Sequence, residues 1–115
     1  MLVGFALFKR LRREWECLEV FPQATARILG ASSTHKSQAG GLAAQLRAVA
    51  RFTGWPESPN VQSFQAAVHG PAHDGLDAYL SAWVAALEPN QRTGLGVPPS
   101  DVIWVPSKGL LSNPL

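Results

Sequence analysis

Cysteine is almost absent from the 115-residue sequence, in which Cys17 is the only one. A single thiol excludes an intramolecular disulfide and fits a reducing compartment. It also excludes the cysteine pairs that hold structural zinc. Because Cys17 falls in a predicted buried strand, we interpret it as a small apolar residue and not as a nucleophile.

Long apolar runs are lacking as well. No stretch approaches the roughly 20 residues that a membrane-spanning helix needs. The apolar start, Met1–Phe8, has no basic residues before it and no small-residue cleavage site after it, unlike a signal peptide. We therefore expect this stretch to open a helix, and we expect a cytoplasmic protein with no membrane partner.

Several catalytic and binding motifs are missing. The sequence has neither of the standard glycine-rich phosphate loops and no Gly-x-Ser-x-Gly elbow, which argues against nucleotide binding by such a loop and against serine-hydrolase chemistry. His69 and His73 are four residues apart, but Gly70 and Pro71 lie between them. This interruption prevents the two imidazoles from forming a helical metal-binding pair.

The composition is that of one small globular domain, with 46% apolar and 16% charged residues. We place this domain at residues 1–106, followed by a loose tail at 107–115. The net charge of +2 is weak evidence for a polyanionic partner. Four basic residues of the chain cluster near its start, where they form either a solvated helix face or a phosphate-contacting patch. The cluster consists of Lys9, Arg10, Arg12 and Arg13.

Hydrophobic periodicity predicts a helix-rich α/β fold. The predicted helices are Leu2–Trp15, Pro22–Leu29, Leu42–Thr53, a helix capped by Asn60 that runs through Val68, and His73–Leu87. The predicted strands are Glu16–Phe21 and Asp101–Pro106. Glycine, proline and polar residues predict loops at 31–41 and from Pro89 through Ser100. We expect the long His73–Leu87 helix to pack on the small sheet.

Three carboxylates stand out against this framework. Asp74 and Asp77 lie in the opening turns of the longest helix, where they either cap it or hold a divalent cation through oxygen. In the capping alternative, Asp74 is the N-cap. Glu19 interrupts an otherwise apolar strand, so its carboxylate either reaches water at the strand end or belongs to a site.

The sequence resembles the domain-of-unknown-function family 429, whose members are predicted nucleases of the ribonuclease H-like fold. Three segments carry the resemblance, in the same order and spacing, between about Arg10 and Pro106. They are Glu19-Val20-Phe21-Pro22, His73-Asp74-Gly75-Leu76-Asp77-Ala78 and Ile103-Trp104-Val105-Pro106.

The resemblance implies a partial ribonuclease H-like fold and a metal-dependent phosphodiester hydrolysis. Glu19, Asp77 and Asp74 would bind Mg²⁺ or Mn²⁺, and the ions would activate a water and stabilise the leaving oxygen. His73 would orient a ligand or face the phosphate, and Lys36 would support the ligands from its loop. Nucleic acid would then be the partner.

The family's first-strand aspartate has no counterpart here, so we expect the chain to match only the C-terminal half of that domain. A second hypothesis is therefore a non-catalytic remnant or interaction module. It would self-associate through an exposed strand edge or the apolar face of the first helix, or pair with a separate N-terminal half. A third hypothesis makes the carboxylates purely structural.

Overall fold

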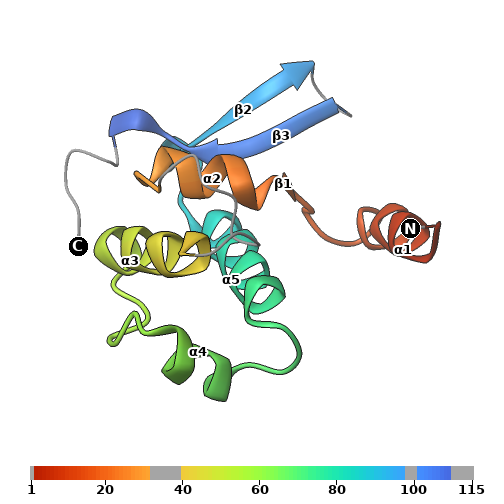
Figure 1. Cartoon of the computed structure of the whole chain (residues 1–115). Helices are drawn as coiled ribbons and strands as arrows, with labels where there is room; N and C mark the ends of the chain where they lie inside the picture. Colours follow the sequence, from red (N-terminus) through yellow and green to blue (C-terminus); the bar gives the residue numbers. More distant parts are fainter. Residues whose placement is uncertain (1, 32–39, 98–100, 110–115) are drawn as a thin grey trace.

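The computed structural model describes residues 2–31, 40–97 and 101–109, which form a mixed α/β structure (Figure 1). The helices are α1 (Leu2–Leu11), α2 (Pro22–Ile28), α3 (Gly41–Thr53), α4 (Val61–Ala67) and α5 (Ala72–Ala86). The strands are β1 (Glu19–Val20), β2 (Arg92–Val97) and β3 (Asp101–Pro106), and a 3₁₀ turn at Pro89–Gln91 joins α5 to β2. The helix-rich α/β class predicted from the sequence is confirmed.

The three strands form one sheet in the order β1-β3-β2. The central strand β3 is parallel to β1, with Glu19 opposite Ile103. It is antiparallel to β2, with Leu95 opposite Ile103. The predicted strand at 101–106 is confirmed, whereas the predicted loop after Pro89 is wrong over β2. That segment becomes a strand because β3 supplies its hydrogen-bonding partner.

Two predicted elements are shorter than expected. The predicted strand Glu16–Phe21 is reduced to the two residues of β1, which pair with Ile103 and Trp104. The first helix was predicted to reach Trp15, but α1 ends at Leu11. Beyond that residue the N–H groups of Arg13 and Glu14 bond to carbonyls three residues back, which tightens the chain into turns.

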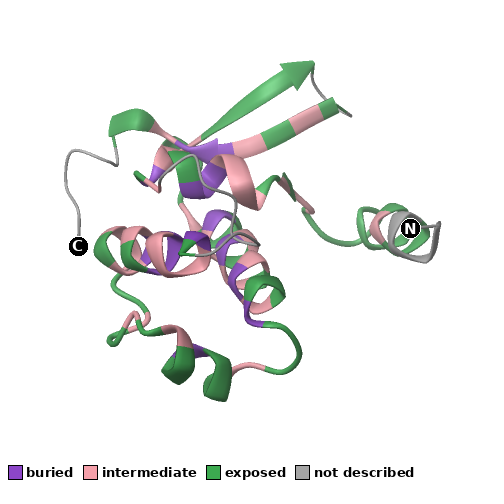
Figure 2. Ribbon diagram, in the orientation of Figure 1, coloured by how far each residue is buried: buried purple, intermediate pink, exposed green. Residues whose placement is uncertain are grey.

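The hydrophobic core lies where α2, α3, α4 and α5 meet, and Figure 2 shows the buried residues gathered there. The predicted apolar stripe of α5 is confirmed, because Leu76, Leu80 and Val84 are fully buried. On α3, Leu46 and Val49 are also fully buried, as their helical spacing predicts. As predicted, α5 also lies against β1 and β3.

Helix α1 lies apart from this core (Figure 1). The helical period puts Phe8, Leu11 and Trp15 on one face of the first helix, and of these Leu11 is 41% exposed and Trp15 is 64% exposed. A helical period shows which side chains share a face, not whether another element covers that face. No helix in the described ranges is both long enough and apolar enough to cross a membrane.

The two predicted N-caps have different outcomes. Asn60 caps α4 as predicted, since its Oδ1 accepts a hydrogen bond of 3.1 Å from the N–H of Ser63. The prediction that Asp74 caps α5 is wrong, because Pro71 occupies the cap position and makes no side-chain cap hydrogen bond. Pro71 has an extended backbone with ψ of 139°, so the helix begins at the next residue, Ala72, ahead of His73.

Candidate functional site

Glu19 lies in β1 and is exposed to solvent. Its partner across the parallel pair is Ile103, which is 37% exposed. Of the two alternatives left open by the sequence, the structure places the Glu19 carboxylate where it reaches water. The cost of burying an unpaired charge therefore does not arise at this position.

The helix carboxylates lie in the first two turns of α5. Asp74 has a side chain that is 66% exposed, and its Oδ1 lies 3.4 Å from Nε2 of His73, which is 46% exposed. Asp77 is half-buried, one turn further along. Lys36, predicted to support the metal ligands, lies outside the described residues.

The predicted ligands do not come together as one cluster in the described part of the chain. Within residues 2–31, 40–97 and 101–109, no group of three or more His, Cys, Asp or Glu side chains is arranged to hold a metal ion. Figure 1 shows why: the first turn of α5 follows the α4 loop, at the end of the helix away from the sheet that contains Glu19. The Mg²⁺ or Mn²⁺ site therefore stays a prediction.

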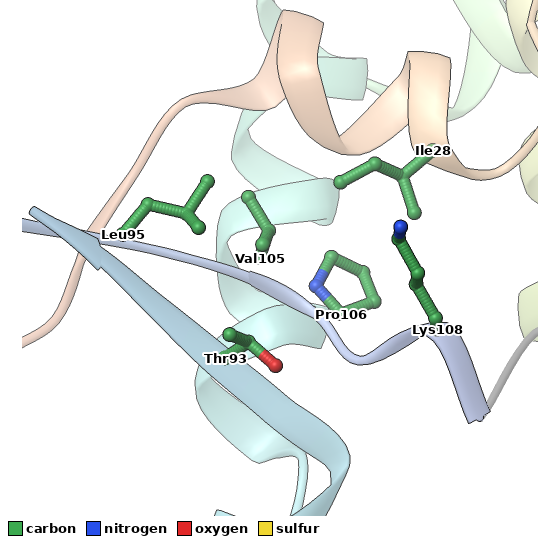
Figure 3. Close-up of a pocket in the computed structure, with 6 residues that line it drawn as sticks. All are labelled: Ile28, Thr93, Leu95, Val105, Pro106 and Lys108. Carbon is green, nitrogen blue, oxygen red and sulfur yellow. The ribbon is translucent and has the colours of Figure 1, made fainter.

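A pocket not anticipated from the sequence lies between α2 and the sheet (Figure 3). Its volume is about 720 Å³, which falls within the range of small-ligand pockets. The lining residues are Ile28, Thr93, Leu95, Val105, Pro106 and Lys108. The Lys108 amine is the only ionisable side-chain group among them, so the lining is suited to apolar contact and not to acid–base catalysis.

The pocket continues into an uncovered apolar surface of the sheet. Leu95 and Ile103 are directly opposite each other across β2 and β3, so their side chains share one face. Val97 lies two residues from Leu95 and therefore on the same face. Leu95 is 53% exposed and Val97 is 71% exposed. We call Leu95, Val97 and Ile103 the hairpin patch.

Glycines in β2 made this strand hard to predict from the sequence, and the packing on the face opposite the hairpin patch explains why they are there. A Cβ atom at Gly94 would lie 2.8 Å from Cγ1 of Val102 and 3.3 Å from the Trp104 ring. Glycine there leaves room for those two side chains of β3 to lie across β2. The alternation Thr93, Leu95, Val97 is the signal in the sequence that indicates a strand here.

Arg92 links the start of β2 to the end of α5 through hydrogen bonds. Its Nη1 donates to the carbonyl oxygens of Ala85 at 3.3 Å and Leu87 at 2.9 Å, and its Nη2 donates to Glu16 at 2.8 Å. The guanidinium also lies 5.4 Å from the centre of the Trp104 ring. The base of the hairpin is therefore fixed, while the far part of β2 extends beyond the helices (Figure 1).

Comparison with protein-family models, with curated proteins and with solved structures gives no match to this chain. The ribonuclease H-like architecture and the family resemblance therefore remain predictions. The functional argument depends on the surfaces that the chain itself presents.

Proposed function

We propose that the chain is an interaction module that self-associates by pairing β2 with β2 of a second copy. The exposure of β2 carries this proposal, because five of its six residues are exposed. Strand β3 pairs with one side of β2, and no strand in the described ranges pairs with the other. Such an edge offers unpaired backbone N–H and C=O groups that another strand can complete.

The outer edge of β2 lacks the usual protection against strand addition. Natural edge strands often carry lysine or proline, or are covered by another element. Residues 93–97 read Thr-Gly-Leu-Gly-Val and contain neither a charge nor a proline. The segment is therefore chemically compatible with close approach of a second strand.

A second copy of this chain fits the edge because antiparallel pairing of a strand with its own copy has two-fold symmetry. Leu95, near the middle of β2, would lie close to Leu95 of the second copy. The pairing brings no like charges together, and it extends the apolar face that carries the hairpin patch. A single edge contact is small, so we expect a weak, concentration-dependent dimer.

Sedimentation equilibrium over a wide range of protein concentration tests this proposal. Leu95→Lys places two positive charges next to each other in the dimer and is expected to raise the dissociation constant by about tenfold or more. Leu11→Lys is the matched control, because it makes the same substitution at an exposed leucine of α1, 41% exposed against 53% at Leu95. A dimer that is lost in Leu11→Lys and kept in Leu95→Lys would assign self-association to α1 and refute the proposal, as would a wild type that stays monomeric.

The metal-dependent nuclease implied by the family resemblance remains a prediction with its own test. Asp74 and Asp77 offer two carboxylates in adjacent turns, and oxygen ligands suit Mg²⁺ and Mn²⁺. Calorimetric titration with Mn²⁺ should show binding that Asp77→Asn abolishes. Absence of heat in the wild type would contradict the prediction, and it would leave the β2 proposal unaffected.

A further inference from the structure

The segment from Ala6 to Trp15 presents an apolar face and a basic face on opposite sides. Leu7, Leu11 and Trp15 follow one another at intervals of four residues, and they are 55%, 41% and 64% exposed. Although α1 ends at Leu11, the N–H of Trp15 bonds to the carbonyl of Leu11 at 2.9 Å and closes one further turn. These three side chains form an uncovered apolar stripe.

The basic residues lie on the other side of the same segment. Lys9, Arg10 and Arg13, at i, i+1 and i+4, border one surface depression together with Ala6 and Glu14. Arg12 lies at the boundary between the two faces, with its guanidinium 5.6 Å from the centre of the Phe8 ring. Long basic side chains at such a boundary can place an apolar stem against a membrane and a charged end in water.

This segment carries a local excess of positive charge. Residues 9–16 contain four basic and two acidic residues, a net charge of +2 that equals the net charge of the complete sequence. The remaining charges sum to zero, although residues 20–56 contain four basic residues and no acidic one. The excess positive charge at residues 9–16 lies beside exposed leucine and tryptophan side chains, and this segment lies apart from the core (Figure 1).

We propose that this segment docks on the surface of an anionic phospholipid bilayer, in contrast to the expectation from the sequence of no membrane partner. The apolar stripe would enter the boundary between headgroups and acyl chains, where tryptophan is favoured, while the basic face meets the anionic headgroups. A nucleic acid would engage only the basic face and leave Leu7, Leu11 and Trp15 in water. A bilayer satisfies both faces at once, and this is why we favour it.

Vesicle co-sedimentation tests the proposal with the full chain, using phosphatidylcholine vesicles with and without phosphatidylglycerol. We expect binding to the anionic vesicles and much weaker binding to the neutral ones. The double variant Arg10→Gln/Arg12→Gln should lower the partition constant about 30-fold, roughly fivefold for each arginine near an anionic surface. Leu11→Gln should lower it about tenfold by removing apolar contact.

Arg47→Gln/Arg51→Gln is the matched control for the charge change. Both of its arginines are exposed on α3, and Arg51 lies 5.6 Å from the Phe52 ring, as Arg12 does from Phe8. This variant removes the same charge and the same kind of ring contact, and it should keep wild-type binding. Leu95→Lys should also still bind vesicles, which separates this proposal from self-association through β2.

Three outcomes would overturn the lipid proposal. The first is no binding of the wild type to anionic vesicles, and the second is equal loss in the Arg10/Arg12 and Arg47/Arg51 variants. The third is binding of a single-stranded oligonucleotide that is lost in Arg10→Gln/Arg12→Gln and unchanged in Leu11→Gln. This pattern would identify a phosphate-contacting patch.

Discussion

Gly75 lies inside α5 and faces Val68. Replacing Gly75 with alanine should lower the stability of the wild-type protein and raise the stability of a variant that lacks the Val68 side chain. A Cβ atom at this position would lie 3.0 Å from both Cβ and Cγ1 of Val68, and 3.1 Å from its Cγ2. Because Cβ of Val68 is itself among the crowded atoms, a change of side-chain rotamer cannot relieve the contact. The backbone between α4 and α5 has to move.

Two opposing effects set the magnitude for Gly75→Ala. Alanine is favoured over glycine in a helix interior by about 1 kcal/mol. Inserting one carbon into a packed contact typically costs 1–3 kcal/mol. We therefore expect Gly75→Ala to lower the free energy of unfolding by about 1 kcal/mol. In a Val68→Gly background, which also removes Cβ of residue 68, the crowding disappears, and Gly75→Ala should raise the free energy of unfolding by up to about 1 kcal/mol.

Urea denaturation followed by circular dichroism measures the four members of this double-mutant cycle. The predicted coupling energy is about 2 kcal/mol. Ala78→Gly, at an exposed position of the same helix, provides the propensity term alone and should cost about 1 kcal/mol. If Gly75→Ala has the same effect on the free energy of unfolding with Val68 as with glycine at position 68, the close approach of the two segments is refuted.

Three further changes address other contacts, all measured by urea denaturation. Tyr79→Phe removes a 2.8 Å hydrogen bond to Oγ1 of Thr53 and should cost about 1 kcal/mol; no loss would contradict that contact. Leu80→Ala empties a fully buried position and should cost 2–5 kcal/mol, roughly, whereas a cost below about 1 kcal/mol would place Leu80 outside the core. Arg92→Gln should cost about 1 kcal/mol because it removes the hydrogen bond to the part-buried carbonyl of Leu87, while water can reach the carbonyl of Ala85. Glu16→Gln should change stability little, since Glu16 is 74% exposed, and an equal loss in both variants would instead make their ion pair the dominant contact.

The helical part of the fold was predictable because its information is local. Leu76, Leu80 and Val84 repeat at helical spacing, and that spacing is enough to identify both the helix and its buried face. The same holds for Leu46 and Val49 on α3. Proline and glycine mark the ends of these helices closely, since Pro22 opens α2 and Gly54 follows α3 in a left-handed conformation with φ of 80°.

The β2 strand was not predictable in the same way because its information is distributed along the chain. Gly94 and Gly96 lower local strand propensity and favour a loop when considered alone. In the structure they lie opposite Trp104 and Val102 of β3. The segment becomes a strand because of that pairing. Which residues of β3 lie opposite each glycine depends on the register of the whole hairpin, and local sequence patterns do not give that register.

The carboxylate site shows a different limit. Helical phase correctly puts Asp74 and Asp77 in the opening turns of α5, but phase says nothing about which distant residues come near them. Glu19 was linked to them through the family resemblance, and the described part of the chain does not assemble the three into a metal-binding group. Whether residues from different elements lie close together depends on tertiary packing. The grouping of these three carboxylates could therefore be examined only in the structure.

Two of the segments where prediction from the sequence went wrong, the end of α1 and strand β2, also carry the proposals. Local rules fail where a segment's stability or exposure depends on a partner, and such places are expected to be functional. Leu11 and Trp15 form an apolar stripe that the core does not cover, and Leu95 and Val97 form part of a sheet face that α2 does not reach. An isolated chain gains nothing from exposing leucine and tryptophan in groups. We therefore interpret both exposed surfaces as positions whose partners lie outside the described fold, a second copy at β2 and an anionic bilayer at α1.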